Sequence, residues 1–238
     1  MSILIASPFA SGGGGSSLLT NLAASWKLDD LTDSSGNGNT LTNNNSATFN
    51  TGKIGNAVYL TAASSQFLSM ASNSFVQTGD VDFTIGLWVY LADLSSYYVA
   101  IAKRGDTAGQ DEYVIYYDAG VGRFVAEVYK ATDSSVVVTA NNFGAPSATT
   151  WYCVMLWHDS VGDTVNISVN NGTADSTATG GALQAASNGL FTIGEQDQGG
   201  GFLYWNGRID DANIWKRVLS GAERTNFYNS GTGREYPF

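Results

Sequence analysis

The densest group of possible metal ligands lies near the start of the chain, where five oxygen-bearing side chains fall within eleven residues: Asp29, Asp30, Asp33, Asn37 and Asn39. Ca²⁺ takes roughly six to eight oxygen ligands, which carboxylates, side-chain amides and the carbonyls of a Gly-rich loop supply. The alternative is a metal-free loop closed by Asx-turns, in which the same side chains accept hydrogen bonds from backbone N–H groups. The spacing and the missing final Glu exclude an EF-hand.

A further carboxylate, Asp210, lies far along the chain, on a predicted strand. It shares its phase with Ala212 and Ile214, so we expect it to point inward. An inward carboxylate needs a cation or several hydrogen-bond donors. We therefore expect Asp210 to join the N-terminal loop, where a bound Ca²⁺ would tie the first strand to one of the last and serve a structural role.

The nearest approach to a glycosidase pair is Glu195 with Asp197, beside the glycines of residues 199–201. A retaining glycosidase needs two carboxylates about 5–5.5 Å apart across the scissile bond. No third acidic residue accompanies Glu195 and Asp197, as the arrangement of such glycosidases requires. We predict that the chain is not an enzyme and has no catalytic residues.

Two other reactive groups also favour a structural interpretation. His158, Asp159 and Ser160 are consecutive, and neighbours on a strand point to opposite faces, so they are not expected to form a catalytic relay. Cys153 shares its phase with Trp151 and is expected to be an inert buried thiol.

Sugar binding commonly uses an exposed aromatic platform with polar partners. Six aromatic residues are candidates, and among them we favour Tyr98, Tyr117 and Trp205. The other three are Tyr97, Tyr116 and Tyr204. The alternative for each is burial, because most aromatic side chains of a sandwich belong to its core.

These residues must be positioned by strands. Residues 164–169 alternate between polar and apolar side chains, which is typical of a half-buried antiparallel strand, and Asn171-Gly172 then predicts a type I′ hairpin turn. Ser220 and Glu223 form a capping box that predicts a helix to about Asn229. We predict an all-β fold, a two-sheet antiparallel jelly-roll sandwich with one short C-terminal helix.

The chain divides at about residue 20. Residues 1–20 form an apolar arm and a Gly/Ser linker, and residues 21–238 form the sandwich. We expect the arm to become ordered only when it docks on a partner subunit, which makes the protein oligomeric through this arm.

Charge excludes several kinds of partner. The chain carries 11 basic and 21 acidic residues, for a net charge of -10. Nucleic acid needs a basic patch, and an anionic membrane surface attracts basic segments, so neither is expected as a partner. Without an apolar run of about 20 residues, membrane insertion is not expected.

Seven segments, in order, resemble the laminin-G-like jelly-roll family of the concanavalin A-like lectin/glucanase superfamily, of the kind found in phage-encoded and secreted proteins. They are residues 26–30 (WKLDD), 33–39 (DSSGNGN), 52–58 (GKIGNAV), 83–89 (FTIGLWV), Trp151 before an apolar strand, 169–172 (VNNG) and 207–211 (GRIDD) with Ile214, Leu219, Ser220 and Glu223. The resemblance implies two stacked antiparallel sheets, glycan binding or adhesion, and a structural Ca²⁺. It carries the calcium and loop-tethering positions onto Asp29, Asp33, Asn37 and Asp210.

Two functions follow from these features. The first is a non-catalytic surface protein, a structural, decoration or fibre subunit of a virion that also binds glycans. The apolar arm, the charge-poor surface and a tail that looks like those of phage-encoded relatives favour this hypothesis. The alternative is a secreted or cell-surface carbohydrate-binding module. Partners are glycans or other subunits of an assembly, and the location is the virion surface or, alternatively, extracellular.

Overall fold

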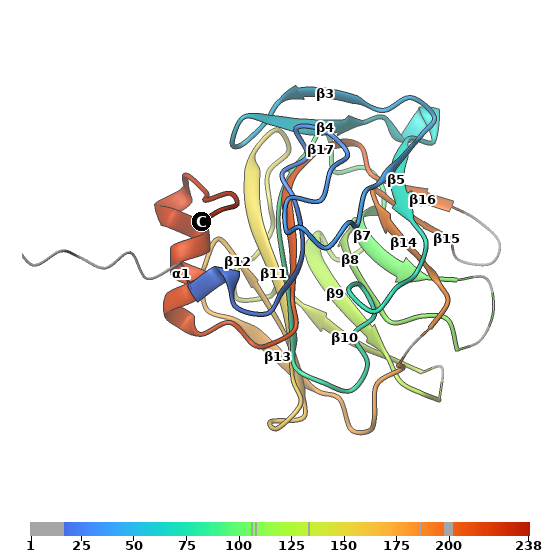
Figure 1. Cartoon of the computed structure of the whole chain (residues 1–238), viewed down its shortest axis with the longest axis vertical. Helices are drawn as coiled ribbons and strands as arrows, with labels where there is room; N and C mark the ends of the chain where they lie inside the picture. Colours follow the sequence, from blue (N-terminus) through green and yellow to red (C-terminus); the bar gives the residue numbers. More distant parts are fainter. Residues whose placement is uncertain (1–16, 106, 108, 133, 186, 198–201) are drawn as a thin grey trace, which may run out of the picture.

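Two antiparallel sheets stack face to face in the computed structural model (Figure 1). The structure describes residues 17–238 except 106, 108, 133, 186 and 198–201. The predicted arm therefore lies outside the described residues, and its docking stays a prediction. The described residues contain no helix that is long and apolar enough to cross a membrane.

The first sheet has eight strands in the order β13-β12-β11-β6-β17-β4-β3, with β1 also paired to β17. Its strands are β1 (Leu22–Trp26), β3 (Thr48–Thr51), β4 (Asn56–Leu60), β6 (Phe83–Leu91), β11 (Trp151–Asp159), β12 (Thr164–Val169), β13 (Asp175–Ala178) and β17 (Gly207–Trp215). The second sheet has seven strands in the order β10-β9-β8-β7-β14-β5-β2. Its strands are β2 (Thr42–Asn44), β5 (Phe67–Met70), β7 (Tyr98–Arg104), β8 (Tyr113–Asp118), β9 (Arg123–Tyr129), β10 (Ser135–Thr139) and β14 (Leu190–Ile193). A small hairpin of β15 (Glu195–Asp197) and β16 (Phe202–Tyr204) lies beside β7.

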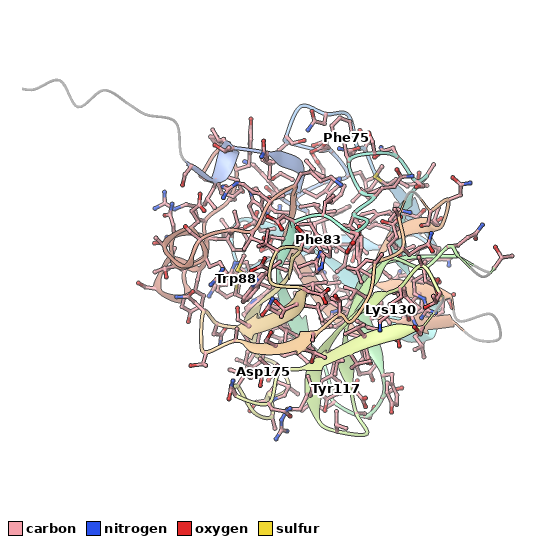
Figure 2. The ribbon with its side chains drawn as sticks, turned by 90° about the horizontal axis from the view of Figure 1, so that it is seen from below. Phe75, Phe83, Trp88, Tyr117, Lys130 and Asp175 are labelled. Carbon is pink, nitrogen blue, oxygen red and sulfur yellow. The ribbon has the colours of Figure 1, made fainter. Side chains whose placement is uncertain are left out.

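The core lies between the sheets because each strand turns one phase of its side chains inward. On β6, Phe83, Ile85 and Leu87 belong to the central apolar cluster, whereas Trp88 belongs to a second cluster on the opposite face. Figure 2 shows Phe83 near the middle of the molecule and Trp88 toward the C-terminal helix. This two-sided burial explains why β6 is buried along almost its whole length.

The outer face of the first sheet is covered by α1 (Gly221–Tyr228), which packs Phe227 against Trp215. The capping box is present: Ser220 Oγ accepts from Glu223 N, and Glu223 Oε2 accepts from Ser220 N. Asn229 ends the helix in the left-handed conformation. The predicted fold class and C-terminal helix are therefore confirmed.

The hairpin after β12 differs from the prediction by one residue. Gly172 N donates to Val169 O, and positive φ angles fall on Asn170 and Asn171. The turn is therefore centred on the Asn170-Asn171 pair rather than on Asn171-Gly172. Asn tolerates the left-handed region well enough to occupy both central positions of such a turn.

Candidate functional site

The N-terminal loop is held by hydrogen bonds that fill the carboxylate of Asp33. Its Oδ1 accepts from the backbone N–H groups of Ser25 (3.0 Å) and Ser35 (2.9 Å), and its Oδ2 accepts from N (3.0 Å) and Nδ2 (2.8 Å) of Asn39. Burial alone would raise the pKa of Asp33, but these hydrogen bonds outweigh it and lower the pKa. Four donors occupy the lone-pair positions of this carboxylate, which is the Asx-turn arrangement rather than that of a metal ligand.

Asn37 contributes to the same tether. Its Nδ2 donates to the backbone carbonyls of Ala23 (3.0 Å) and Leu22 (3.3 Å), which fastens the loop to β1. Asp33 and Asn37 therefore both tether the loop, through hydrogen bonds within it and to β1.

Asp29 and Asp210 meet at a different place, the turn between β3 and β4. Asp210 Oδ2 accepts from the N–H groups of Lys53 (2.6 Å) and Ile54 (2.9 Å), and Asp29 Oδ1 accepts from Asn56 N (2.6 Å). Asp210 is buried, and its Oδ1 has no hydrogen-bond partner in the part of the chain that the structure describes. Burial raises the pKa of Asp210 to about 7, and the carboxylate of Asp29 adds to this effect.

The four predicted ligands therefore separate into two pairs. No group of three or more His, Cys, Asp or Glu side chains placed to hold a metal occurs among the described residues. The saturated carboxylate of Asp33 does not fit a calcium site, whereas the unpartnered Oδ1 of Asp210 does. A calcium ion at Asp29 and Asp210 stays a prediction.

The His158-Asp159-Ser160 segment does not form a relay. His158 Nδ1 lies 3.0 Å from Val81 O, Asp159 Oδ1 accepts from the N–H groups of the following turn, and Ser160 Oγ donates to Asp82. The thiol of Cys153 is buried, and burial raises its pKa far above the usual range. Both observations agree with the structural interpretation of these residues.

The structure corrects the expected aromatic platform. Tyr98, Tyr117 and Trp205 are 5%, 3% and 0% exposed and belong to the central core. Tyr98 Oη donates to Asp93, and Trp205 Nε1 donates to Tyr90 O. A sugar cannot stack on rings whose faces are covered by protein, so these three are structural.

A cleft of about 410 Å³ lies on the outer face of the second sheet. Strands β5, β7, β14 and β15 contribute to it, on the opposite side of the sandwich from α1 (Figure 1). Two apolar side chains line it, Phe67 and Leu190, together with the polar side chains of Arg104, Gln110, Asn188, Thr192, Glu195 and Gln196. Sites for small molecules commonly combine a volume in this range, roughly 300–1,000 Å³, with a few placed polar groups.

One wall of the cleft rests on a buried ion pair. Lys103 Nζ lies 3.0 Å from Glu112 Oε1, and both side chains are 0% exposed. Lys103 also donates to Ser187 O and Oγ (both 2.8 Å) and to Gly189 O (3.1 Å), while Glu112 Oε1 accepts from Ser187 N. Burial lowers the pKa of Lys103, although Glu112 opposes this effect. The pair thereby fixes the segment of residues 187–189 that borders the cleft.

A smaller depression of about 90 Å³ lies on the same face, lined by Tyr97, Val99, Tyr116, Glu127, Gln196 and Leu203. Gln196 lines both hollows, so they adjoin. Tyr97 is 43% exposed. Burial raises the pKa of Tyr116, and the nearby carboxylates of Glu127 and Asp118 raise it further.

The rings at the depression, the exposed Tyr97 and the half-buried Tyr116, were among the six candidates, and they are the immediate neighbours of the favoured Tyr98 and Tyr117. Tyr97 precedes Tyr98 and Tyr116 precedes Tyr117, and successive residues of a strand face opposite sides. The charged residues of the same strands carried the missing signal: Tyr116 shares its phase with Asp118, and the charged Glu127 faces outward on β9.

Comparison with known proteins establishes the class. The sequence model of the concanavalin A-like lectin/glucanases superfamily matches residues 61–223, more than half of the chain. The chain therefore belongs to this superfamily, as a laminin-G-like jelly-roll domain. A search of curated protein sequences gives no significant match.

Solved structures share the fold at low sequence identity. The binding domain of Paraclostridial Mosquitocidal Protein 1 is 18% identical with a TM-score of 0.72, over 90% of this chain and 53% of that one. The botulinum neurotoxin serotype D ligand-binding domain, solved in complex with N-acetylneuraminic acid, is 13% identical with a TM-score of 0.68, over 88% and 50%. Domain 4 of AbnA, an extracellular arabinanase from Geobacillus stearothermophilus, in complex with arabinotriose, is 18% identical with a TM-score of 0.66, over 90% and 98%. The chain spans about half of the two toxin domains and nearly all of the arabinanase domain.

Proposed function

We propose that this chain is a non-catalytic carbohydrate-binding module whose glycan site is the cleft on the outer face of the second sheet. The observation that carries the proposal is the cleft itself, which combines Phe67 and Leu190 with several amide, hydroxyl and charged groups. Apolar C–H faces and hydroxyl groups alternate on a sugar ring, so a site for it needs both kinds of contact. The arabinanase domain, which was solved with a bound trisaccharide, supports this use of the fold.

The comparisons support a glycan-binding module better than a virion subunit. Two of the similar structures contain a bound sugar, and one belongs to an extracellular arabinanase. We propose an extracellular location, where glycans are displayed. The role in a virion and assembly through the N-terminal arm stay predictions, which detection of this chain in purified particles would test.

Titration calorimetry against arabinotriose and a panel of other oligosaccharides tests the proposal. Phe67→Ala and Leu190→Ala should each weaken binding about tenfold, because burying such a side chain against a ligand contributes about 1.5 kcal/mol or more. Val161→Ala is the matched control, since Val161 is 94% exposed in the turn between β11 and β12 of the other sheet. Binding by no glycan, or unchanged binding by both cleft variants, would contradict the proposal.

A further inference from the structure

This inference rests on the proposed function, in which the cleft binds a glycan. The charges around the cleft and the smaller depression then discriminate between neutral and acidic glycans. Among the described lining residues, Arg104 carries the positive charge, and its guanidinium is already paired with Asp111 (2.8 Å) and stacked over the ring of Tyr129 (4.7 Å). Two carboxylates line the hollows, Glu195 in the cleft and Glu127 in the smaller depression. A ligand carboxylate that reaches the smaller depression would therefore meet the carboxylate of Glu127, and the Arg104 guanidinium is already paired.

Gln196 also favours a neutral sugar over an acidic one. The residue is 3% exposed and lines both hollows, and its Oε1 has no hydrogen-bond partner among the residues that the structure describes. A buried carbonyl oxygen requires a donor. A sugar hydroxyl is such a donor, whereas an ionised carboxylate only accepts hydrogen bonds.

The arrangement of the hollows also bears on ligand length. Gln196 lines both the cleft and the smaller depression, which also contains the exposed ring of Tyr97. A single sugar unit in the cleft leaves the Tyr97 ring uncovered. A chain of sugar units that passes over Gln196 uses both surfaces.

From these contacts we infer that the site takes a neutral oligosaccharide of more than one unit and disfavours sialylated or uronic-acid glycans. Gln196 is the specificity-determining residue: its Oε1 accepts a hydroxyl of the unit that crosses between the hollows. The carboxylate of Glu127 repels a ligand carboxylate.

Comparisons of neutral with acidic glycans test this inference on the full chain. Calorimetry would compare lactose with 3′-sialyllactose, and arabinotriose and xylotriose with trigalacturonate. In each comparison in which binding is detected, the neutral glycan should bind at least about tenfold more tightly than the acidic one, because like charges placed against each other disfavour binding. Glu127→Gln should narrow that difference, and so should higher salt, which screens the repulsion. Gln196→Leu should weaken neutral glycans about tenfold, with a melting temperature measured alongside to show that the variant folds.

The outcomes separate the inference from the proposed function. If acidic glycans bind as well as or better than their neutral counterparts, or if Glu127→Gln leaves the preference unchanged, the charge discrimination is wrong while glycan binding stands. If folded Gln196→Leu binds like the unmodified chain, the role of Gln196 is wrong. If no neutral or acidic glycan of the panel binds, the proposed function fails and the inference fails with it.

Discussion

Replacement of Lys103 by Met should destabilise the protein strongly, because it leaves a buried carboxylate without its cation. The Lys103 ammonium contacts Glu112, Ser187 and Gly189 at 2.8–3.1 Å inside a region from which solvent is excluded. Met fills most of the same volume, so the change removes charge and donors rather than packing.

The size of the effect follows from what Glu112 retains. Its carboxylate keeps the donors Thr78 and Ser187, but it loses the positive charge that offsets its desolvation. Removal of one partner of a buried ion pair typically costs about 3–5 kcal/mol. In a chain of this size each kcal/mol lowers the melting temperature by about 2–4 °C, so Lys103→Met should melt about 6–20 °C earlier. The cleft wall at residues 187–189 loses its anchor, so glycan affinity should fall as well.

Urea unfolding followed by tryptophan fluorescence measures this loss. Lys130→Met, which removes a half-buried lysine directly after β9 of the same sheet (Figure 2) that forms no ion pair among the described residues, should stay within about 0.5 kcal/mol of the unmodified protein. The double variant Lys103→Met/Glu112→Gln should recover at least half of the loss, because it removes the uncompensated charge. A loss below about 1 kcal/mol for Lys103→Met, or a double variant less stable than the single one, would refute the ion-pair argument.

Three further predictions concern the rest of the molecule. Hydrogen bonds from Arg217 are the main cause that lowers the pKa of Glu223 to about 2. The ionised Glu223 therefore stabilises the fold by about 1–3 kcal/mol above its unfolded pKa near 4, and this contribution is lost as the pH falls from about 5 to 2. Glu223→Gln should flatten that part of a curve of stability against pH. If Ca²⁺ binds at Asp29 and Asp210, a hundredfold excess of Ca²⁺ over its Kd should stabilise the protein by about 2.7 kcal/mol, and Asp210→Ala should abolish this stabilisation. A melting temperature that EDTA does not change, together with no calcium by elemental analysis, would contradict the calcium prediction. Deletion of residues 1–10 should impair particle attachment or oligomerisation, and unchanged assembly would contradict the docking hypothesis.

Local patterns predicted the features that local physics determines. The capping box at Ser220 and Glu223 needs only neighbouring residues, and the structure has its helix there. The alternation of β12 predicted a strand with one face on the core, which Val165, Ile167 and Val169 form, but the expected half-burial was wrong because the opposite face is buried as well. Asp33 and Asn37 lie in one loop, but whether their side chains bind a cation or backbone groups depends on the fold of that loop around β1, which residue types alone do not specify.

The site was harder to predict because its parts meet only across strands. A slip of one residue in phase exchanges Tyr97 for Tyr98 and turns an exposed ring into a core ring. Lys103 resembles an ordinary exposed lysine in the sequence, since nothing local shows that the strand buries it opposite Glu112. Gln196 acquires its position from the β15–β16 hairpin, which is three residues long on each strand and has little periodicity of its own.

The outer faces of the two sheets differ in what covers them. The outer face of the first sheet is occupied by α1, where Phe227 and Trp215 close it from solvent. The outer face of the second sheet carries the two hollows instead, with amide, hydroxyl and aromatic groups around them. With only 13% charged residues and an acidic excess, the chain has little positive charge to offer an anionic ligand. A neutral, hydroxyl-rich ligand is the class whose donors and apolar faces match what this surface presents.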